Sequence, residues 1–198
     1  MTMALDAHTD TSDEALLVLY ANGDRHAALA LTHRITPRVL AYAYRLLAGD
    51  RTEAEDVAQE TMLRLWRVAP EWRQGEAKVA TWAYRVATNL CTDRFRAQRR
   101  QGRMALDDAP EEADPGVSAD TRLVESDRFN ALQAALADLP ERQRQAVVLR
   151  HIEGLSNPDI AEVMGLGVEA VESLTARGKR ALAAILSGRK SELGYEDD

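Results

Sequence analysis

The chain has 198 residues and a formal net charge of −7, with 45% hydrophobic and only 5% aromatic residues. Its single cysteine, Cys91, excludes an internal disulfide framework and a cysteine-rich zinc site. No apolar run approaches the length of a membrane span, and the acidic N-terminus is unlike a signal sequence, so we expect a cytoplasmic protein. Few segments alternate with a period of two, which favours an all-α protein of one or two small domains.

The first hundred residues are predicted to form four helices. Ser12 is a plausible N-cap for the first helix, and Asp24 begins the second. Pro37 is expected to break or kink that second helix before its apolar pattern continues. Thr52 is expected to cap the third helix, and a loop with an exposed Trp72 precedes the fourth, arginine-rich helix. The expected ranges are 12–22, 25–36 continued by 39–47, 53–68 and 79–103.

The remaining chain is predicted to be a linker followed by a second helical domain. Acidic residues dominate positions 102–121, which also contain two prolines, and this composition is typical of a flexible linker that avoids DNA. Ser156 and Asp159 resemble a capping box, and the turn Gly165-Leu166-Gly167 separates the last two helices. This outline fits a helix-turn-helix or an ordinary helical hairpin. The predicted divisions are a domain over 1–101, the linker over 102–121, a domain over 122–188 and a polar tail over 189–198.

The third predicted helix has one apolar and one polar side. The apolar stripe consists of Ala54, Ala58, Met62, Leu65 and Ala69. The opposite side carries Asp56, Gln59, Glu60 and Leu63. A compact polar cluster with one exposed leucine suits docking onto a protein partner, and a solvated helix face is the simpler alternative. The helix lacks the Glu-x-x-His repeats of a metal-binding bundle.

Positive charge is concentrated in residues 79–103. Six arginines lie there with a single acid, Asp93, although the whole chain is acidic, and this contrast indicates an anionic partner such as nucleic acid. Trp82 and Tyr84 lie among these residues, and flat rings beside phosphate-binding groups suit unpaired bases; the alternative is a solvated face with ordinary core aromatics. Helical periodicity predicts an exposed strip made of Thr81, Arg85, Thr88, Asn89, Thr92, Arg96 and Arg99. It predicts a buried side made of Ala83, Val86, Ala87 and Leu90.

Four motifs together resemble bacterial sigma factors. They are DVAQE at residues 56–60, TWAYRVATN at 81–89, LPERQR at 139–144 and IAEVMG at 160–165. Their order and spacing resemble the small two-domain extracytoplasmic-function (ECF) class over residues 15–186, although no single motif is specific. The resemblance implies a promoter-specificity subunit of RNA polymerase, usually held inactive by an anti-sigma protein.

The resemblance also implies a role for particular residues. The coiled coil of the largest polymerase subunit would dock on Asp56, Gln59, Glu60 and Leu63. Unstacked bases of the −10 element would be captured by Trp72, Arg73, Lys78, Trp82, Arg85, Asn89, Arg96 and Arg99. The −35 element would be read in the major groove by Glu169, Ser173, Arg177, Lys179 and Arg180. The last helix is less basic than the family pattern, which predicts weaker contacts to the −35 element than to the −10 element.

We expect no catalytic site, cofactor, metal ion or small-molecule substrate. The sequence contains no GxxxxGK[ST] loop, and its four histidines are scattered rather than set at ligand spacing. Opening a duplex costs a few kcal/mol per extruded base, which base capture and polymerase contacts could supply without hydrolysis. Two other classes stay open, namely a sigma-like decoy that titrates an inhibitor and a conventional helix-turn-helix repressor or activator.

Overall fold

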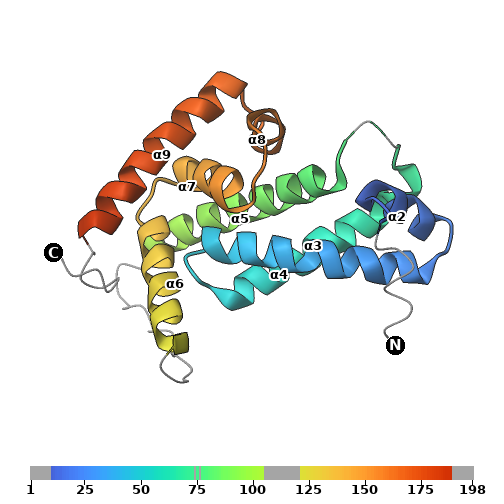
Figure 1. Ribbon diagram of the computed structural model, residues 1–198, viewed down its shortest axis with the longest axis horizontal. Coiled ribbons are helices and arrows are strands. Elements are labelled where there is room, and N and C mark those ends of the chain that lie inside the picture. The colour runs from blue at the N-terminus through green and yellow to red at the C-terminus, as the bar shows by residue number, and fades with distance from the viewer. Residues whose placement is uncertain (1–9, 74, 76, 105–120, 189–198) are drawn as a thin grey trace.

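The computed structural model describes residues 10–73, 75, 77–104 and 121–188, and every regular element within these ranges is helical (Figure 1). The all-α prediction is therefore confirmed. Most of the predicted linker and the predicted tail lie outside the described residues, although 102–104 belong to a helix and 121 begins one. The elements are α2 (Asp13–Ala21), α3 (Arg25–Leu46), α4 (Arg51–Val68), η1 (Ala69–Glu71), α5 (Val79–Met104), α6 (Thr121–Ala137), α7 (Glu141–Val147), η2 (Val148–Ile152, a π-helical turn), α8 (Asn157–Met164) and α9 (Val168–Gly188).

Side-chain caps fix where the early helices begin. The Ser12 hydroxyl accepts a hydrogen bond from the Ala15 amide at 3.2 Å, and Asp24 caps α3, as predicted. The prediction that Thr52 caps α4 is wrong. The carboxylate of Asp50, two residues earlier, accepts from the Glu53 amide at 2.9 Å, so α4 begins at Arg51.

Helix α3 stays helical through Pro37, so the predicted break does not occur. A proline inside a helix removes one backbone hydrogen bond and costs about 3 kcal/mol or more. Ile35 and Val39, on either side of Pro37, are each 1% exposed. The contact between α3 and α4 is the most extensive between any two of the described elements. Burial of each such side chain contributes about 1.5–3 kcal/mol, which offsets the cost of the proline.

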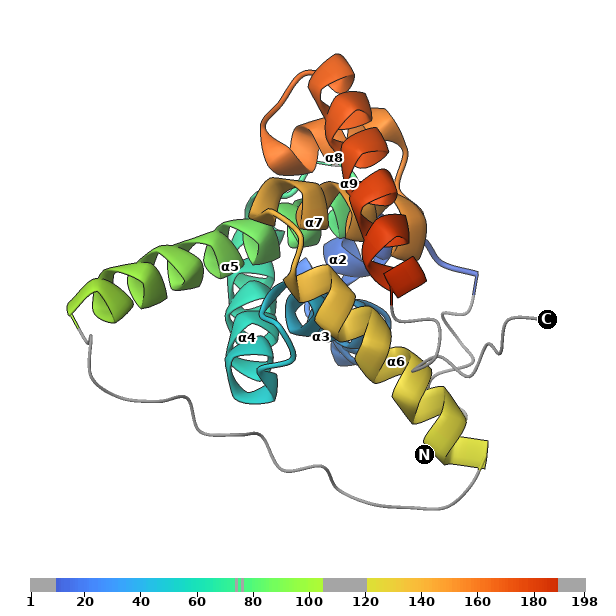
Figure 2. The same ribbon diagram turned by 90° about the vertical axis from the view of Figure 1, so that its left-hand side faces the viewer.

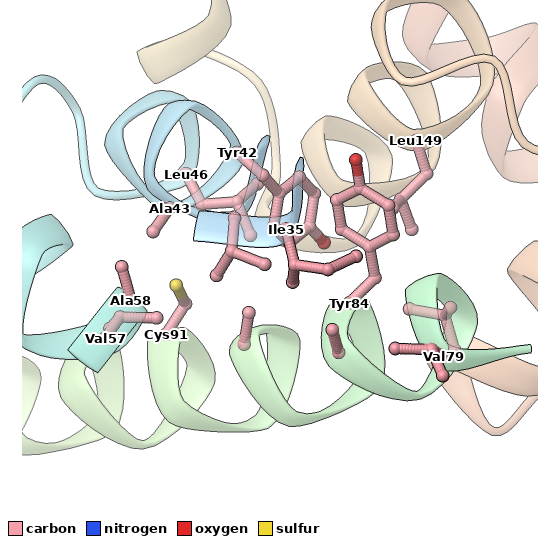
Figure 3. Close-up of a cluster of buried hydrophobic side chains, with 14 of the residues drawn as sticks. Ile35, Tyr42, Ala43, Leu46, Val57, Ala58, Val79, Tyr84, Cys91 and Leu149 are labelled. Atoms are coloured by element: carbon pink, nitrogen blue, oxygen red, sulfur yellow. The ribbon is translucent and has the colours of Figure 1, made fainter. Parts of the chain in front are cut away.

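Two tyrosines form the centre of the N-terminal unit, which comprises the described residues 10–104. Tyr42 of α3 and Tyr84 of α5 meet edge to face with ring centroids 5.2 Å apart (Figure 3). The Tyr42 hydroxyl lies 2.8 Å from that of Thr88. Cys91 lies in the same core, fully buried, and this burial raises the pKa of its thiol to about 12. The thiol is therefore neutral at physiological pH and acts as a packing group.

The C-terminal unit, residues 121–188, contains the predicted helix-turn-helix. Ser156 caps α8 by accepting from the Asp159 amide at 3.3 Å, and its hydroxyl donates back to the Asp159 carboxylate at 2.6 Å. Gly165 adopts φ +63°, a left-handed conformation that suits a glycine after a helix C-terminus. Helix α9 then packs on both α7 and α8 (Figure 1).

The two units pack directly on each other. Leu149 and Ile160 of the C-terminal unit belong to the same buried cluster as Val79 and Tyr84 of α5, and Figure 3 shows Leu149 beside the Tyr84 ring. Arg144 is 7% exposed and joins the units by donating to the carbonyl oxygen of Leu46 at 2.6 Å. Figure 2 shows that the C-terminal part of α5 projects beyond the other helices.

Gly178 tests the close approach of α9 to α7. A Cβ at this position would lie 2.6 Å from Cγ2 of Val147 and 3.1 Å from the Gln143 carbonyl oxygen, and the backbone oxygen cannot easily move. We expect Gly178→Ala to lower the free energy of unfolding by about 1–3 kcal/mol, measured by urea denaturation. Gly188→Ala in the same helix, with no neighbour within 4 Å, is the control and should be neutral. Equal midpoints for both variants would contradict this packing.

Candidate nucleic-acid interface

The polar face of α4 is exposed as predicted. Ala54, Ala58, Met62, Leu65 and Ala69 are buried, whereas Leu63 is 50% exposed and flanked by the exposed Asp56 and Gln59. Glu60 is half-buried and accepts a hydrogen bond from Arg64 at 2.7 Å, which lowers the pKa of its carboxyl group. This face therefore offers a leucine surrounded by groups that are charged or hydrogen-bonding at neutral pH.

The arginines and the asparagine predicted on the cationic side of α5 are exposed where the structure describes their side chains, whereas the threonines predicted beside them are not. Arg85, Asn89 and Arg96 are all exposed, and we call them the strand surface. Asp93 lies 3.7 Å from Arg96, an exposed pair that contributes little to stability. Arg99 lies on the same helix, but its side chain is outside the described residues.

The threonines predicted on that exposed strip are instead contact residues inside the fold. Thr81 and Thr88 are 3% and 5% exposed. The Thr88 hydroxyl hydrogen-bonds the Tyr42 hydroxyl and donates to the Tyr84 carbonyl, and Thr92 donates to Glu141 of α7 at 2.9 Å. A short hydroxyl side chain can be buried once a partner satisfies it, so the buried side of α5 is wider than the apolar pattern indicates.

The predicted exposure of Trp72 is wrong. Trp72 is half-buried and meets Trp82 at 6.2 Å between ring centroids, with an interplanar angle of 84°. Its indole nitrogen is buried and has no hydrogen-bond partner in the described part of the chain. Arg73, by contrast, is exposed. The pair of indoles thus forms an aromatic wall at the base of the loop that leads into α5.

The junction between this loop and α5 depends on residues that the sequence did not reveal. Lys78 precedes the first residue of α5 and carries no acceptor that could cap the helix. The carboxylate of Glu14, from α2, takes that role and accepts from the Val79 amide at 3.0 Å. Lys78 itself donates to both carboxylate oxygens of Asp159, at 3.0 and 3.2 Å. A negative charge at the start of α5 also complements the helix dipole.

The predicted −35 residues of α9 are exposed on one helix. Glu169, Ser173, Arg177 and Arg180 recur at helical spacing, and Lys179 lies beside them. Near Lys179 the structure adds two residues that sequence analysis missed, Arg150 and His151. Burial lowers the pKa of His151, and Lys179 and Arg150 lower it further, so the imidazole is neutral at physiological pH. The signal in the sequence is the adjacent pair Arg150 and His151, which precedes Gly154 by four and three residues.

Within the described ranges, no helix is both long and apolar enough to cross a bilayer. In the same part of the chain, no group of three or more His, Cys, Asp or Glu side chains is arranged to hold a metal ion.

Comparisons with known proteins identify the family. Residues 31–101 match the sigma-70 region 2 family model, and residues 129–182 match the sigma-70 region 4 family model. The ECF RNA polymerase sigma factor SigE of Mycolicibacterium smegmatis is 35% identical over 192 residues, which cover 92% of this chain and 72% of SigE. The chain belongs to the ECF RNA polymerase sigma factors.

The helices of this sigma factor are arranged as in solved structures. CnrH, determined in complex with the cytosolic domain of CnrY, gives a TM-score of 0.65 at 26% identity and covers 89% of this chain and 97% of CnrH. The sigma factor RpoE of Bartonella quintana, determined with the anti-sigma factor NepR, shares the fold with a TM-score of 0.62 at 21% identity, over 79% of this chain and 94% of RpoE.

Family membership gives the sigma factor its general activity. It is a transcription regulator that directs RNA polymerase to promoters, and at the level of the family it is not an enzyme. The polar face of α4 and the strand surface of α5 fall within the region 2 match, and the exposed residues of α9 fall within the region 4 match. Glu14 lies outside both matches.

Glu14 is expected to keep the loop and the start of α5 in register. Glu14→Ala leaves the Val79 amide without its acceptor, at a cost of about 1 kcal/mol for a lost cap. We expect promoter opening by the reconstituted holoenzyme to fall about fivefold, measured by permanganate reactivity of −10 thymines, with unchanged affinity for core polymerase. Glu14→Gln retains the oxygen acceptor and should be close to wild type. Wild-type opening by Glu14→Ala would contradict a positioning role.

Proposed function

We propose that the polar face of α4 is the surface that docks on the coiled coil of the largest polymerase subunit. Asp56, Gln59, Glu60 and Leu63 meet the requirements of such a site, since an exposed leucine can enter an apolar pocket while the carboxylates around it pair with basic groups. The buried stripe on the other side of α4 packs on α3 and α5, which holds this face rigid.

The −10 element is captured, in this proposal, by the strand surface and the aromatic wall. The observation that carries the proposal is that Arg85, Asn89 and Arg96 are exposed along one side of α5, on the same unit as the polar face of α4. Trp72 and Trp82 offer rings on which an extruded base can stack, a contact that contributes about 1–3 kcal/mol. Arg73 and Lys78 complete this site, and we include Arg99 from its place in the sequence.

Helix α9 enters the major groove at the −35 element in the same proposal. Arg177, Lys179 and Arg180 supply cations for phosphates or guanine edges, and Glu169 can accept from the exocyclic amine of cytosine. Ser173 can donate or accept. The predicted domain over 1–101 therefore binds polymerase and the −10 element, and the predicted domain over 122–188 reads the −35 element.

Regulation and location complete the proposal. CnrH was solved with the cytosolic domain of CnrY, which supports a protein inhibitor, an anti-sigma factor, as a partner of this chain. Strand opening uses binding energy alone, so we propose no catalytic step, cofactor or metal ion. Because bacterial RNA polymerase and promoter DNA are cytoplasmic, we propose the cytoplasm as the place of action.

Charge reversal on α4 tests the polymerase-docking surface. Asp56→Arg places a like charge against the basic groups expected on the partner, so affinity for core polymerase should fall at least tenfold, about 1.4 kcal/mol. Fluorescence titration of the labelled protein with core enzyme measures this. Glu55→Arg changes the neighbouring exposed residue by the same charge and should have a much smaller effect. Equal affinities for Asp56→Arg and wild type, with intact folding, would contradict the assignment.

Alanine substitution on α5 tests strand capture. On a promoter found by sequencing the transcripts of the wild-type holoenzyme, Arg85→Ala and Asn89→Ala should each reduce permanganate reactivity of −10 thymines about tenfold, because contacts made only to the opened strand are lost. Binding to core polymerase should not change. Arg25→Ala, an exposed arginine at the start of α3, is the control. Parallel losses of opening and core binding would indicate a structural role instead.

A further inference from the structure

A polar groove of about 490 Å³ is lined by residues of α4, α5, α7 and α8, and part of its lining has no place in the proposed function. Helix α7 lies beside α5 in both ribbon views (Figures 1 and 2). The volume is within the range of small-molecule sites in proteins, about 300–1,000 Å³. The charged side chains of the lining are Arg64, Asp93, Arg96, Glu141 and Arg142.

Three guanidinium groups reach this groove from three different helices. Arg64 comes from α4, Arg96 from α5 and Arg142 from α7. Arg64 uses its Nε for the bond to Glu60, which leaves the terminal amino groups of the guanidinium as donors. Arg142 is exposed and forms no ion pair with another residue of the described ranges. Guanidinium groups around one groove suit phosphate, which can accept two parallel N–H bonds from each.

The two acids of the lining compensate these cations only in part. One carboxylate oxygen of Glu141 accepts from the Thr92 hydroxyl at 2.9 Å and from the Gln145 amide at 3.2 Å. Asp93 lies 3.7 Å from Arg96, and the two side chains are 73% and 68% exposed, so water and salt screen the pair. Three arginines therefore face two acids, and the groove favours an anion.

The groove suits a compact anion better than an extended DNA strand. The strand surface lies along one side of α5, and neither Arg64 nor Arg142 belongs to it. The charges of a DNA strand follow one another along its backbone, whereas the arginines of the groove come from separate helices. A polyphosphate carries several charges on adjacent phosphate groups, so one small molecule can contact arginines of different helices together.

The same groove also offers contacts for a flat ring. Val163 and Met164 of α8 supply apolar lining, and Met164 is half-buried. A thioether side chain adapts its shape and makes favourable contacts with aromatic rings. Asn89, which is exposed on α5, can donate to and accept from the edge of a base. Phosphate-binding groups and groups that suit a nucleobase therefore line one groove.

From these observations we propose that the groove binds a nucleoside polyphosphate as a ligand that is neither substrate nor cofactor. Arg64, Arg96 and Arg142 contact the phosphates, and Met164 contacts the base. The proposal goes beyond the proposed function, because it assigns a small molecule to side chains from both units. Since such a ligand binds the folded chain, it also raises the Tm of the protein.

Isothermal titration calorimetry of the full chain tests the site with ATP, inorganic pyrophosphate and adenosine, without polymerase, DNA or divalent cations. We expect ATP to bind with a Kd below about 1 mM, pyrophosphate to bind more weakly and adenosine not to bind. Arg142→Gln should weaken ATP binding about tenfold, because a charge-assisted contact is lost. Arg25→Gln changes an exposed arginine that does not line the groove, and its affinity should match that of wild type.

A second variant tests the contact with the base. Met164→Ala, with its fold checked by circular dichroism, should weaken the binding of ATP and leave that of pyrophosphate unchanged. Absence of binding by both phosphate compounds, in calorimetry and in the Tm, overturns the proposal, and so does equal ATP affinity for Arg142→Gln and Arg25→Gln. Equal affinities of wild type for ATP and pyrophosphate, with no effect of Met164→Ala, overturn the nucleoside assignment.

These measurements are independent of the proposed function. They contain no DNA and no polymerase, so a failure to bind ATP leaves the role of the strand surface untouched. Wild-type promoter opening by Arg85→Ala would overturn strand capture and leave the ligand site standing, because Arg85 does not line the groove.

Discussion

The rest of the structure depends on the packing of Tyr84 between the two units. Its ring packs edge-on against Tyr42 in the N-terminal core, and its hydroxyl donates to Glu153 of the C-terminal unit. Burial raises the pKa of this hydroxyl, and the hydrogen bond to Glu153 raises it further, so it remains a donor at physiological pH. One side chain therefore contributes both to the core that positions α5 and to the interface that closes over it.

The charge distribution follows from this arrangement. A polypeptide with net charge −7 would repel DNA if its charges were spread evenly, but α5 and α9 expose arginines, while Glu153 and Asp159 of the C-terminal unit form ion pairs with the N-terminal unit. Arg144 is a buried cation whose hydrogen-bond partners are backbone carbonyl oxygens. Its guanidinium donates to carbonyl oxygens of Leu46, Ala137 and Leu139, where helices end with unpaired acceptors.

Sequence periodicity predicted the helices well because most of them bury one apolar side, as in α4, where the stripe from Ala54 to Leu65 is buried and Leu63 is exposed. It failed where a distant partner changes the environment of a residue. Thr88 looked exposed because it is polar, yet Tyr42, 46 residues away, satisfies its hydroxyl. Glu14 acts on Val79 across 65 residues, and local spacing cannot reveal a cap supplied by another helix. Pro37 failed as a break because burial on both sides of it outweighs one lost hydrogen bond.

The packing of Cys91 has a consequence for the signals that this molecule can answer. Its sulfur is enclosed between α5 and its neighbours and stays protonated, so peroxide or a disulfide reagent does not meet the thiolate of Cys91 while the chain is folded. Should the bacterium use this regulator against oxidants, the oxidant must be detected elsewhere and reach the chain as a change of binding partner. The polypeptide is then a receiver of redox information and not its sensor.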